Sequence, residues 1–300
     1  MRTPFTGLGT ALVTPFTRDG SVDDAGVRRL VRRQIDAGVH FLSPCGTTGE
    51  APTLSQSEKV HVVELIVQEA AGRVPVLAGA GGYNTGDVMA LAQEFERVGA
   101  TGILSVTPYY NKPTQEGLFQ HYEAIAQSTS LPIVLYNVPG RTGVNIEVGT
   151  VARLAALRNI VGVKEASGNV VQMSEILAAA PEDFFLLSGD DPLALAVMAI
   201  GGSGLISVAS NAIPSEMVQI IELAEKGDLP GARRLHGWLL PFLRANFVES
   251  NPIPIKAAMA AMGLIEEVYR LPLVSPGSAA RDTIAAVLQD LKLLGSASRV

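Results

Sequence analysis

The chain has 300 residues, a formal net charge of −6 and only 17% charged residues. A negative chain without a basic tail argues against a nucleic-acid partner or an anionic membrane surface. The single cysteine, Cys45, cannot form an internal disulfide, so we expect a reducing compartment. The length suits one α/β barrel of about 250 residues with some chain left over.

Residues 192–215 carry no charge and are numerous enough to span a bilayer. A helix does not run easily through the Gly-Gly-Ser-Gly sequence at 201–204. We therefore predict a short buried helix over 193–200, a turn, and a buried strand over 205–208. Residues 1–9 have one arginine and no apolar core, so no signal peptide is expected. The chain is expected to be soluble and cytoplasmic, with no membrane partner.

Short apolar runs, typical of buried parallel strands, recur along the chain. We predict strands at 10–13, 40–43, 74–78, 102–106, 132–136, 160–163, 184–187 and 205–208. The segments between them have helical periodicity; one apolar helix face consists of Val88, Leu91, Ala92 and Phe95.

Two helix starts resemble capping boxes, one at Ser21 and Asp24 and one at Ser55 and Glu58. Eight alternations of strand and helix predict an α/β protein, a (β/α)8 TIM barrel. A doubly wound parallel sheet is the alternative fold. After the eighth strand the pattern is helical only, over 214–227, 229–247, 253–262 and 277–294. We assign 1–227 to the barrel with the active site and 228–300 to a C-terminal helical extension.

Active sites of such barrels form at the C-terminal ends of the strands. Lys164 stands there, directly after the apolar run 160–163. Burial favours the neutral form of an amine, and a neutral amine can attack a carbonyl to form a Schiff base. The alternative is a lysine paired with Glu165 or directed outward, and position alone does not decide between them.

Three further groups follow neighbouring strands. Tyr136 ends the preceding strand and is either a proton carrier or an ordinary buried tyrosine. Residues 46–49, Gly-Thr-Thr-Gly, are either a small-anion site or a tight turn. Arg141 is either a carboxylate ligand or a solvated arginine. The scattered histidines have no metal-ligand spacing, so no catalytic metal is predicted, and Cys45 is expected to be a small buried residue.

Seven segments together resemble the dihydrodipicolinate synthase family, also called 4-hydroxy-tetrahydrodipicolinate synthase, of the class I pyruvate-dependent aldolases and lyases. They are GTTGE at 46–50, YYNKP at 109–113, YNVPGRTG at 136–143, GVKEASG at 162–168, LSGDD at 187–191, GLISV at 204–208 and ESNPIPIK at 249–256. The resemblance covers nearly the whole chain and favours a Schiff-base role for Lys164.

The resemblance implies that Lys164 condenses with pyruvate and that the resulting enamine attacks L-aspartate 4-semialdehyde. The amine of the semialdehyde then closes the ring and displaces the lysine, in the diaminopimelate route to lysine. It implies a proton relay of Tyr136, Thr47 and Tyr110, with Tyr110 supplied by a neighbouring subunit. The family is commonly a tetramer built as a dimer of dimers, sometimes a dimer, and needs no external cofactor.

The resemblance also assigns the binding residues. Thr47 and Thr48 hold the pyruvate carboxylate, Arg141 binds the carboxylate of the semialdehyde, and Gly189 and Ile206 line the pocket. The alternative functions are a sibling enzyme, N-acetylneuraminate lyase or a keto-deoxy sugar acid aldolase, and a silent barrel that binds a keto acid. The siblings lack an arginine at the position of Arg141.

Lysine-sensitive family members bind lysine at the dimer interface. The matching positions here are Gln56, Lys59, Tyr83 and Asp87. Because the charge of Lys59 repels an ammonium group, we predict weak or absent inhibition by lysine.

Overall fold

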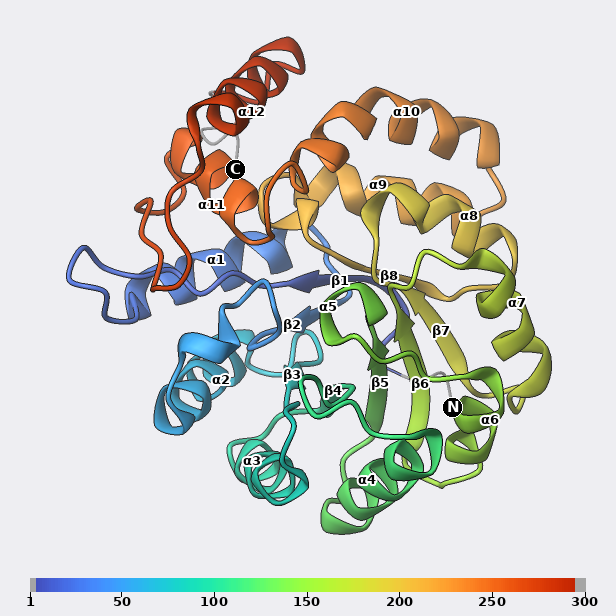
Figure 1. The fold of residues 1–300 in the computed structure, drawn as a ribbon. Coiled ribbons are helices and arrows are strands. Elements are labelled where there is room, and N and C mark those ends of the chain that lie inside the picture. The colour runs from blue at the N-terminus through green and yellow to red at the C-terminus, as the bar shows by residue number, and fades with distance from the viewer. Residues whose placement is uncertain (1–3, 295–300) are drawn as a thin grey trace.

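The computed structural model describes residues 4–294. Parallel strands occupy the centre of the molecule and helices surround them (Figure 1). The strands are β1 (Gly7–Ala11), β2 (Phe41–Ser43), β3 (Leu77–Gly79), β4 (Gly102–Val106), β5 (Ile133–Asn137), β6 (Ile160–Glu165), β7 (Phe185–Ser188) and β8 (Gly204–Ser207).

The sheet order is β2-β1-β8-β7-β6-β5-β4-β3, and its two ends meet. A parallel bridge joins Leu42, in β2, with Val76, which directly precedes β3. Two backbone hydrogen bonds support the closure, from Leu42 to Pro75 at 3.0 Å and from Gly79 to Pro44 at 2.9 Å. The predicted (β/α)8 barrel is therefore confirmed, and the doubly wound sheet is excluded.

The helices follow the strands in the expected alternation. They are α1 (Asp24–Asp36), α2 (Gln56–Ala70), α3 (Thr85–Arg97), α4 (Gln115–Ser128), α5 (Pro139–Thr142), α6 (Val148–Ala155), α7 (Val170–Ala179), α8 (Ala194–Ala199), α9 (Pro214–Glu225), α10 (Leu229–Ala245), α11 (Ile253–Ala261) and α12 (Ser278–Asp290). Short 3-10 turns η1 (Ala51–Thr53), η2 (Asp191–Leu193) and η3 (Ala209–Asn211) lie between them.

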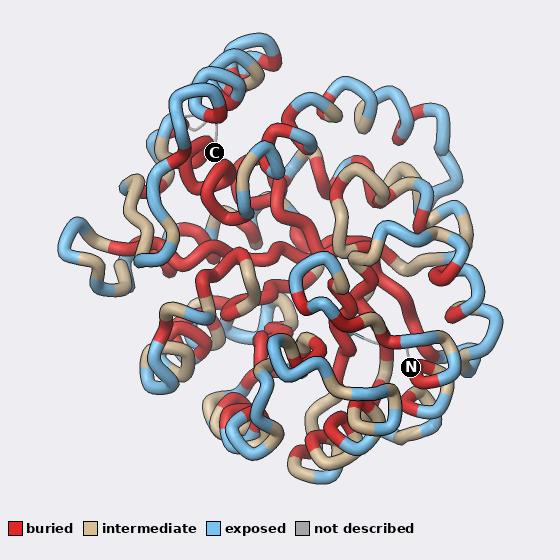
Figure 2. Tube along the Cα trace, viewed as in Figure 1, coloured by how far each residue is buried: buried red, intermediate tan, exposed pale blue. Residues whose placement is uncertain are grey.

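Two apolar layers hold the barrel together. The inner cluster fills its interior and includes Phe5, Phe41, Leu104, Tyr136 and Ile206. The outer layer packs the strands against the helices and continues without a break into α10, α11 and α12. Figure 2 shows this buried centre in red beneath an exposed rim. The C-terminal helices thus share the hydrophobic core of the barrel.

Strand β1 begins three residues earlier than predicted. Glycines 7 and 9 lack the apolar side chains by which a buried strand is identified in a sequence. A Cβ on Gly9 would lie 2.2 Å from the ring of Phe41, so the ring takes the place of the missing side chain. The capping box predicted at Ser21 was wrong: Asp23 caps α1 and accepts a hydrogen bond from the Gly26 N–H at 2.8 Å. The capping box at Ser55 and Glu58 is present.

The uncharged segment 192–215 forms η2, α8, β8 and η3, close to the prediction. Within residues 4–294, no helix is both long enough and apolar enough to cross a membrane. The last predicted helix, 277–294, is shorter than expected and ends at Asp290. Residues 295–300 of the predicted C-terminal extension, and residues 1–3 of the segment read for a signal peptide, lie outside the described residues.

Candidate active site

Lys164 lies on β6 directly opposite Tyr136 on β5. The Nζ of Lys164 is 4.3 Å from the centroid of the Tyr136 ring, and the lysine is only 6% exposed. Among the described residues, no carboxylate lies within ion-pair distance of this amine. The amine of Lys164 therefore lies in the barrel interior with no direct ion pair to the described residues, and the nearest charge named beside it is that of the buried Asp191.

Glu165 points the opposite way, as the alternation of a strand requires. Its carboxylate is fully buried and accepts hydrogen bonds from the Asn137 side chain at 2.8 Å and from the Ser167 N–H at 2.7 Å. The amide of Gln172, on α7, donates to the same carboxylate at 3.3 Å. The alternative pairing of Lys164 with Glu165 is therefore wrong, since helix-facing amide groups hold the glutamate.

Two adjoining cavities lie at the C-terminal ends of the strands, and Lys164 lines the inner one. The inner cavity has a volume of about 130 Å³ and is lined by Lys164, Tyr136, Thr47, Thr48, Arg141 and Gly189, among others. The outer cavity, about 250 Å³, shares Thr47, Tyr136 and Arg141 with it. Six of the eight residues predicted for the site thus meet in one place.

Buried contacts stabilise the threonine turn at 46–49. Thr48 is buried and accepts a hydrogen bond from the Asn251 amide at 2.9 Å. Glu50 directly follows the turn in a left-handed conformation, with φ of 53°, and its carboxylate is 2.5 Å from the Nζ of Lys256. Both members of this ion pair are fully buried. The turn is therefore fixed from α11, which lies far along the chain.

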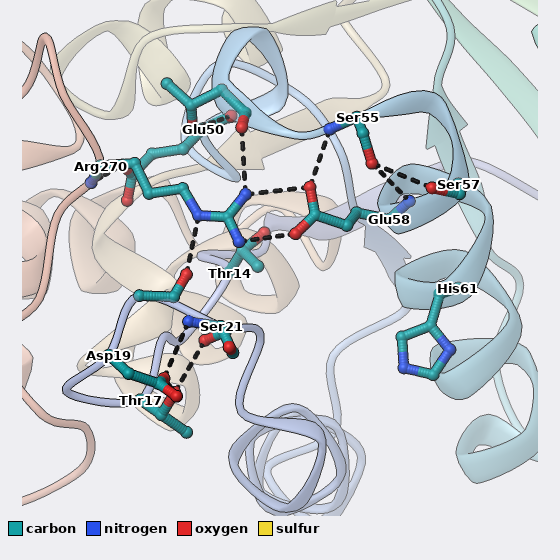
Figure 3. A network of polar contacts seen from close by, with 12 residues as sticks. Thr14, Thr17, Asp19, Ser21, Glu50, Ser55, Ser57, Glu58, His61 and Arg270 are labelled. Carbon is teal, nitrogen blue, oxygen red and sulfur yellow. Dashed lines mark hydrogen bonds and ion pairs between the residues drawn. The ribbon is translucent and has the colours of Figure 1, made fainter.

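Arg270 connects Glu50 of this buried ion pair with Glu58, which lies nearer the surface (Figure 3). Its guanidinium forms a two-pronged ion pair with Glu58, with contacts of 3.0 and 2.6 Å, and also donates to the Gly20 carbonyl at 2.9 Å. The backbone N–H of Arg270 donates to Glu50 at 3.3 Å. This hydrogen-bonded arginine pair lowers the pKa of Glu58 to about 2.

Arg141 lies on the short helix α5, which begins directly after β5. Its guanidinium donates to the Asn251 carbonyl at 3.2 Å, and its side chain lines both cavities while remaining exposed. Gly189 lies against Lys164: a Cβ on Gly189 would be 3.0 Å from the Cε of the lysine. The backbone there leaves room for the lysine chain.

Two predicted residues lie elsewhere. Ile206 is fully buried in the inner cluster and does not line either cavity, whereas Val208, two residues further along, lines the inner one. Tyr110 is 90% exposed and has a positive φ of 65°, and it does not reach the cavities of its own chain.

Sequence reasoning gave no role to two polar residues that line the inner cavity, Asp190 and Asn251. Both stand in segments that carried the family resemblance, which was the available signal. Burial and the neighbouring charge of Asp191 raise the pKa of Asp190 to about 6. Asn251 is only 6% exposed and its Oδ1 accepts no hydrogen bond from the described residues.

The four positions compared with a lysine site line one further cavity of about 440 Å³. They are Gln56, Lys59, Tyr83 and Asp87. Lys59 also lines the outer cavity, so the two spaces adjoin. Cys45 is buried as predicted, and burial raises the pKa of its thiol to about 12. Across residues 4–294, no group of three or more His, Cys, Asp and Glu side chains is arranged to hold a metal ion.

Comparison with known proteins gives a consistent result. The sequence model described as Dihydrodipicolinate synthetase family matches residues 4–291. A relative from Chloroherpeton thalassium named 4-hydroxy-tetrahydrodipicolinate synthase is 50% identical over 294 residues, covering 98% of this chain and 97% of the relative. One with the same name from Koribacter versatilis is 54% identical over 269 residues, covering 89% and 90%. The crystal structure of dihydrodipicolinate synthase from Aquifex aeolicus superposes with a TM-score of 0.95 at 42% identity, covering 97% of this chain and 99% of that one.

Proposed function

The chain belongs to the dihydrodipicolinate synthetase family, and on that premise we propose that it condenses pyruvate with L-aspartate 4-semialdehyde to 4-hydroxy-tetrahydrodipicolinate. This lyase reaction belongs to the diaminopimelate route to lysine. The observation that carries the proposal is the amine of Lys164, which lies in a cavity beside Tyr136 and forms no direct ion pair with the described residues.

The reaction begins at Lys164. Its Nζ attacks the ketone carbon of pyruvate, water leaves, and an iminium forms. Loss of a proton from the methyl group gives an enamine, whose carbon attacks the aldehyde of the semialdehyde. The amine of that substrate then attacks the former ketone carbon and releases Lys164. No external cofactor is involved, because the protonated Schiff base accepts the electron pair that the departing proton leaves behind.

Protons move through Tyr136 and Thr47, which line both cavities. Tyr136 lies against Lys164, so its hydroxyl serves the dehydration that forms the iminium. We place Tyr110 of a neighbouring subunit as the third member of the relay. Its 90% exposure and positive φ support this placement, because a large apolar ring held outward in that conformation is suited to a partner surface.

The carboxylates of the two substrates have separate sites. The hydroxyl and backbone N–H groups of Thr47 and Thr48 take the pyruvate carboxylate, and Arg141 takes the carboxylate of the semialdehyde. Arg141 favours this reaction over that of a sibling pyruvate-dependent aldolase, whose aldehyde presents no carboxylate there. The complete set of Lys164, Tyr136 and Thr47 argues against a silent keto-acid-binding barrel. We further propose a cytoplasmic homo-oligomer, a tetramer of two dimers or a dimer.

A coupled assay tests the function. Purified protein is given pyruvate with L-aspartate 4-semialdehyde and, in separate assays, either pyruvate with N-acetylmannosamine or a keto-deoxy sugar acid alone, which a sibling aldolase would cleave to pyruvate and an aldehyde. The proposal is supported if the semialdehyde is the only aldehyde that is turned over. Preferred turnover of the sugar substrates would instead identify the protein as a sibling aldolase. Borohydride reduction in the presence of pyruvate, followed by peptide mass analysis, should place the adduct on Lys164. An active preparation without an adduct would refute the Schiff-base route.

A further inference from the structure

Three side-chain amides surround the carboxylate of Glu165 on the helix side of β6. Asn137, at the end of β5, donates to the Oε2 of Glu165 at 2.8 Å and to the Oδ1 of Asn145 at 2.7 Å. Gln172, on α7, donates to the same two oxygens at 3.3 and 3.1 Å. The amide nitrogen of Asn145 donates back to Gln172 at 2.8 Å. These four residues form the Glu165 cluster, and all of them except Asn145 are buried.

The Glu165 carboxylate sets the direction of these hydrogen bonds. Both of its oxygens accept, Oε1 from the Ser167 N–H and Oε2 from the amides of Asn137 and Gln172. An amide that turns its NH2 group toward Glu165 has its oxygen on the other side. The Oδ1 of Asn137 accordingly accepts from the backbone N–H of Ile146 at 3.0 Å. A buried network that is satisfied in one sense only holds its segments in one arrangement.

The contact between Asn137 and Ile146 closes a loop that contains α5. Residues 138–145 leave the barrel at the end of β5, form α5 and return at Ile146, so the Asn137 side chain joins the two ends of the loop. Gln172 adds a second contact at the same place, because its amide donates to the Ile146 carbonyl at 3.3 Å. In Figure 1, α5 lies over the central strands. The Glu165 cluster therefore holds the base of the loop that carries Arg141 to the cavities.

Arg141 itself has few contacts that fix its position. It is exposed, and among the described residues its guanidinium donates to the Asn251 carbonyl only, at 3.2 Å. The hydroxyl of Thr142 donates to carbonyls of the loop itself, which stabilises α5 but does not tie it to the barrel. Lys164 and Glu165 are neighbours on β6, so the Glu165 cluster connects the arginine loop directly with the strand of the lysine. The position of Arg141 relative to Lys164 therefore depends on this cluster.

We propose that Gln172 and Asn145 are positioning residues for Arg141. They fix the base of the α5 loop to β6 and so set the place of the guanidinium relative to the amine of Lys164. This inference rests on the proposed function, in which Arg141 binds the carboxylate of the semialdehyde, and it adds the residues that place the arginine. Neither Gln172 nor Asn145 lines the two cavities, so their effect on the reaction passes through Arg141.

Single variants test the first part of the proposal. Gln172→Met keeps the length of the side chain and removes its hydrogen bonds. KM for L-aspartate 4-semialdehyde should rise about three- to tenfold, because a small misplacement of a binding group is costly. The borohydride-trapped pyruvate adduct on Lys164 should form at nearly the wild-type rate, since Glu165 keeps its other two donors. Asn145→Ala should give the same split. Gln120→Met, which changes an exposed glutamine of α4, is the matched control and should leave both values unchanged.

A double variant separates positioning from general damage. A residue that acts through Arg141 has little further effect once the arginine is gone, so Gln172→Met with Arg141→Ala should have nearly the same KM as Arg141→Ala alone. If Gln172→Met does not fold, Asn145→Ala takes its place in this cycle. Effects that multiply in the double variant, or an unchanged KM in both single variants, would overturn the proposal. Equal losses of adduct formation and aldehyde use in the single variants would also overturn it. Wild-type protein that forms the pyruvate adduct but does not use the semialdehyde would instead refute the proposed function.

Discussion

The backbone of Gly189, directly after β7, lies against the Cε of Lys164 on the neighbouring strand β6. A Cβ on Gly189 would be 3.0 Å from that carbon and 2.7 Å from the Cβ of Ala166. Gly189→Ala should therefore displace the lysine chain and slow formation of the pyruvate adduct at least about tenfold, with a loss of about 1–3 kcal/mol in stability from overpacking. Gly149→Ala, where a Cβ meets nothing within 4 Å, is the control for both measurements. Normal adduct formation in Gly189→Ala would show that the lysine has more room than the structure gives it.

Arg141→Ala should impair use of L-aspartate 4-semialdehyde but not the reaction with pyruvate. Because Arg141 lies at the mouth and bonds only to the Asn251 carbonyl among the described residues, its removal should leave the pyruvate adduct on Lys164 nearly unchanged. KM for L-aspartate 4-semialdehyde should rise at least about tenfold, since a charge-assisted carboxylate contact is lost. Steady-state kinetics and borohydride trapping on the same preparation measure both effects. A parallel loss of adduct formation and aldehyde use would remove the role assigned to this arginine.

Subunit mixing tests the proposed position of Tyr110. Tyr110→Phe and Lys164→Ala chains should each be nearly inactive alone. Co-expressed, they should regain activity, because the site with an intact lysine then receives its tyrosine from the other chain. The control mixes Lys164→Ala with Tyr136→Phe; Tyr136 belongs to the same chain as its lysine, so no rescue is expected. Absence of rescue in the first mixture would place Tyr110 outside the relay.

Lys256→Met should destabilise the protein by about 3–5 kcal/mol, because it leaves the carboxylate of Glu50 buried without its cation. The double variant Lys256→Met with Glu50→Gln should recover part of this loss, since no charge then remains buried. Urea unfolding of the three proteins, with Lys226→Met as a control for an exposed ion pair, measures the difference. If Lys256→Met is as stable as the wild type, the buried ion pair contributes little to the free energy of unfolding.

L-Lysine at millimolar concentration should leave the activity unchanged. The amine of Lys59 lines the cavity of the four compared positions and has no ion-pair partner in the described part of the chain, so it repels a ligand ammonium. Lys59→Gln in the same assay shows whether that charge is the cause. Strong inhibition of the wild type by lysine would contradict the prediction.

The sequence predicted most of the barrel because its strands are buried on both faces and stand out as apolar runs. It misplaced β1, where Gly9 has no side chain and the ring of Phe41 fills the space. The sequence did not show which way the Lys164 side chain points. Lys164 and Glu165 are adjacent on β6, and only the structure shows which of the two faces the barrel interior. Asn251 was also not found, because the missing hydrogen-bond partner of its Oδ1 is a property of the folded chain that no spacing in a sequence records.

The threonine turn near residue 47 is held by Asn251, Lys256 and Arg270, which lie some two hundred positions later in the sequence. A chain that ends before this segment lacks every one of these contacts, so we expect its active-site turn to be unsupported and the truncated protein to be inactive.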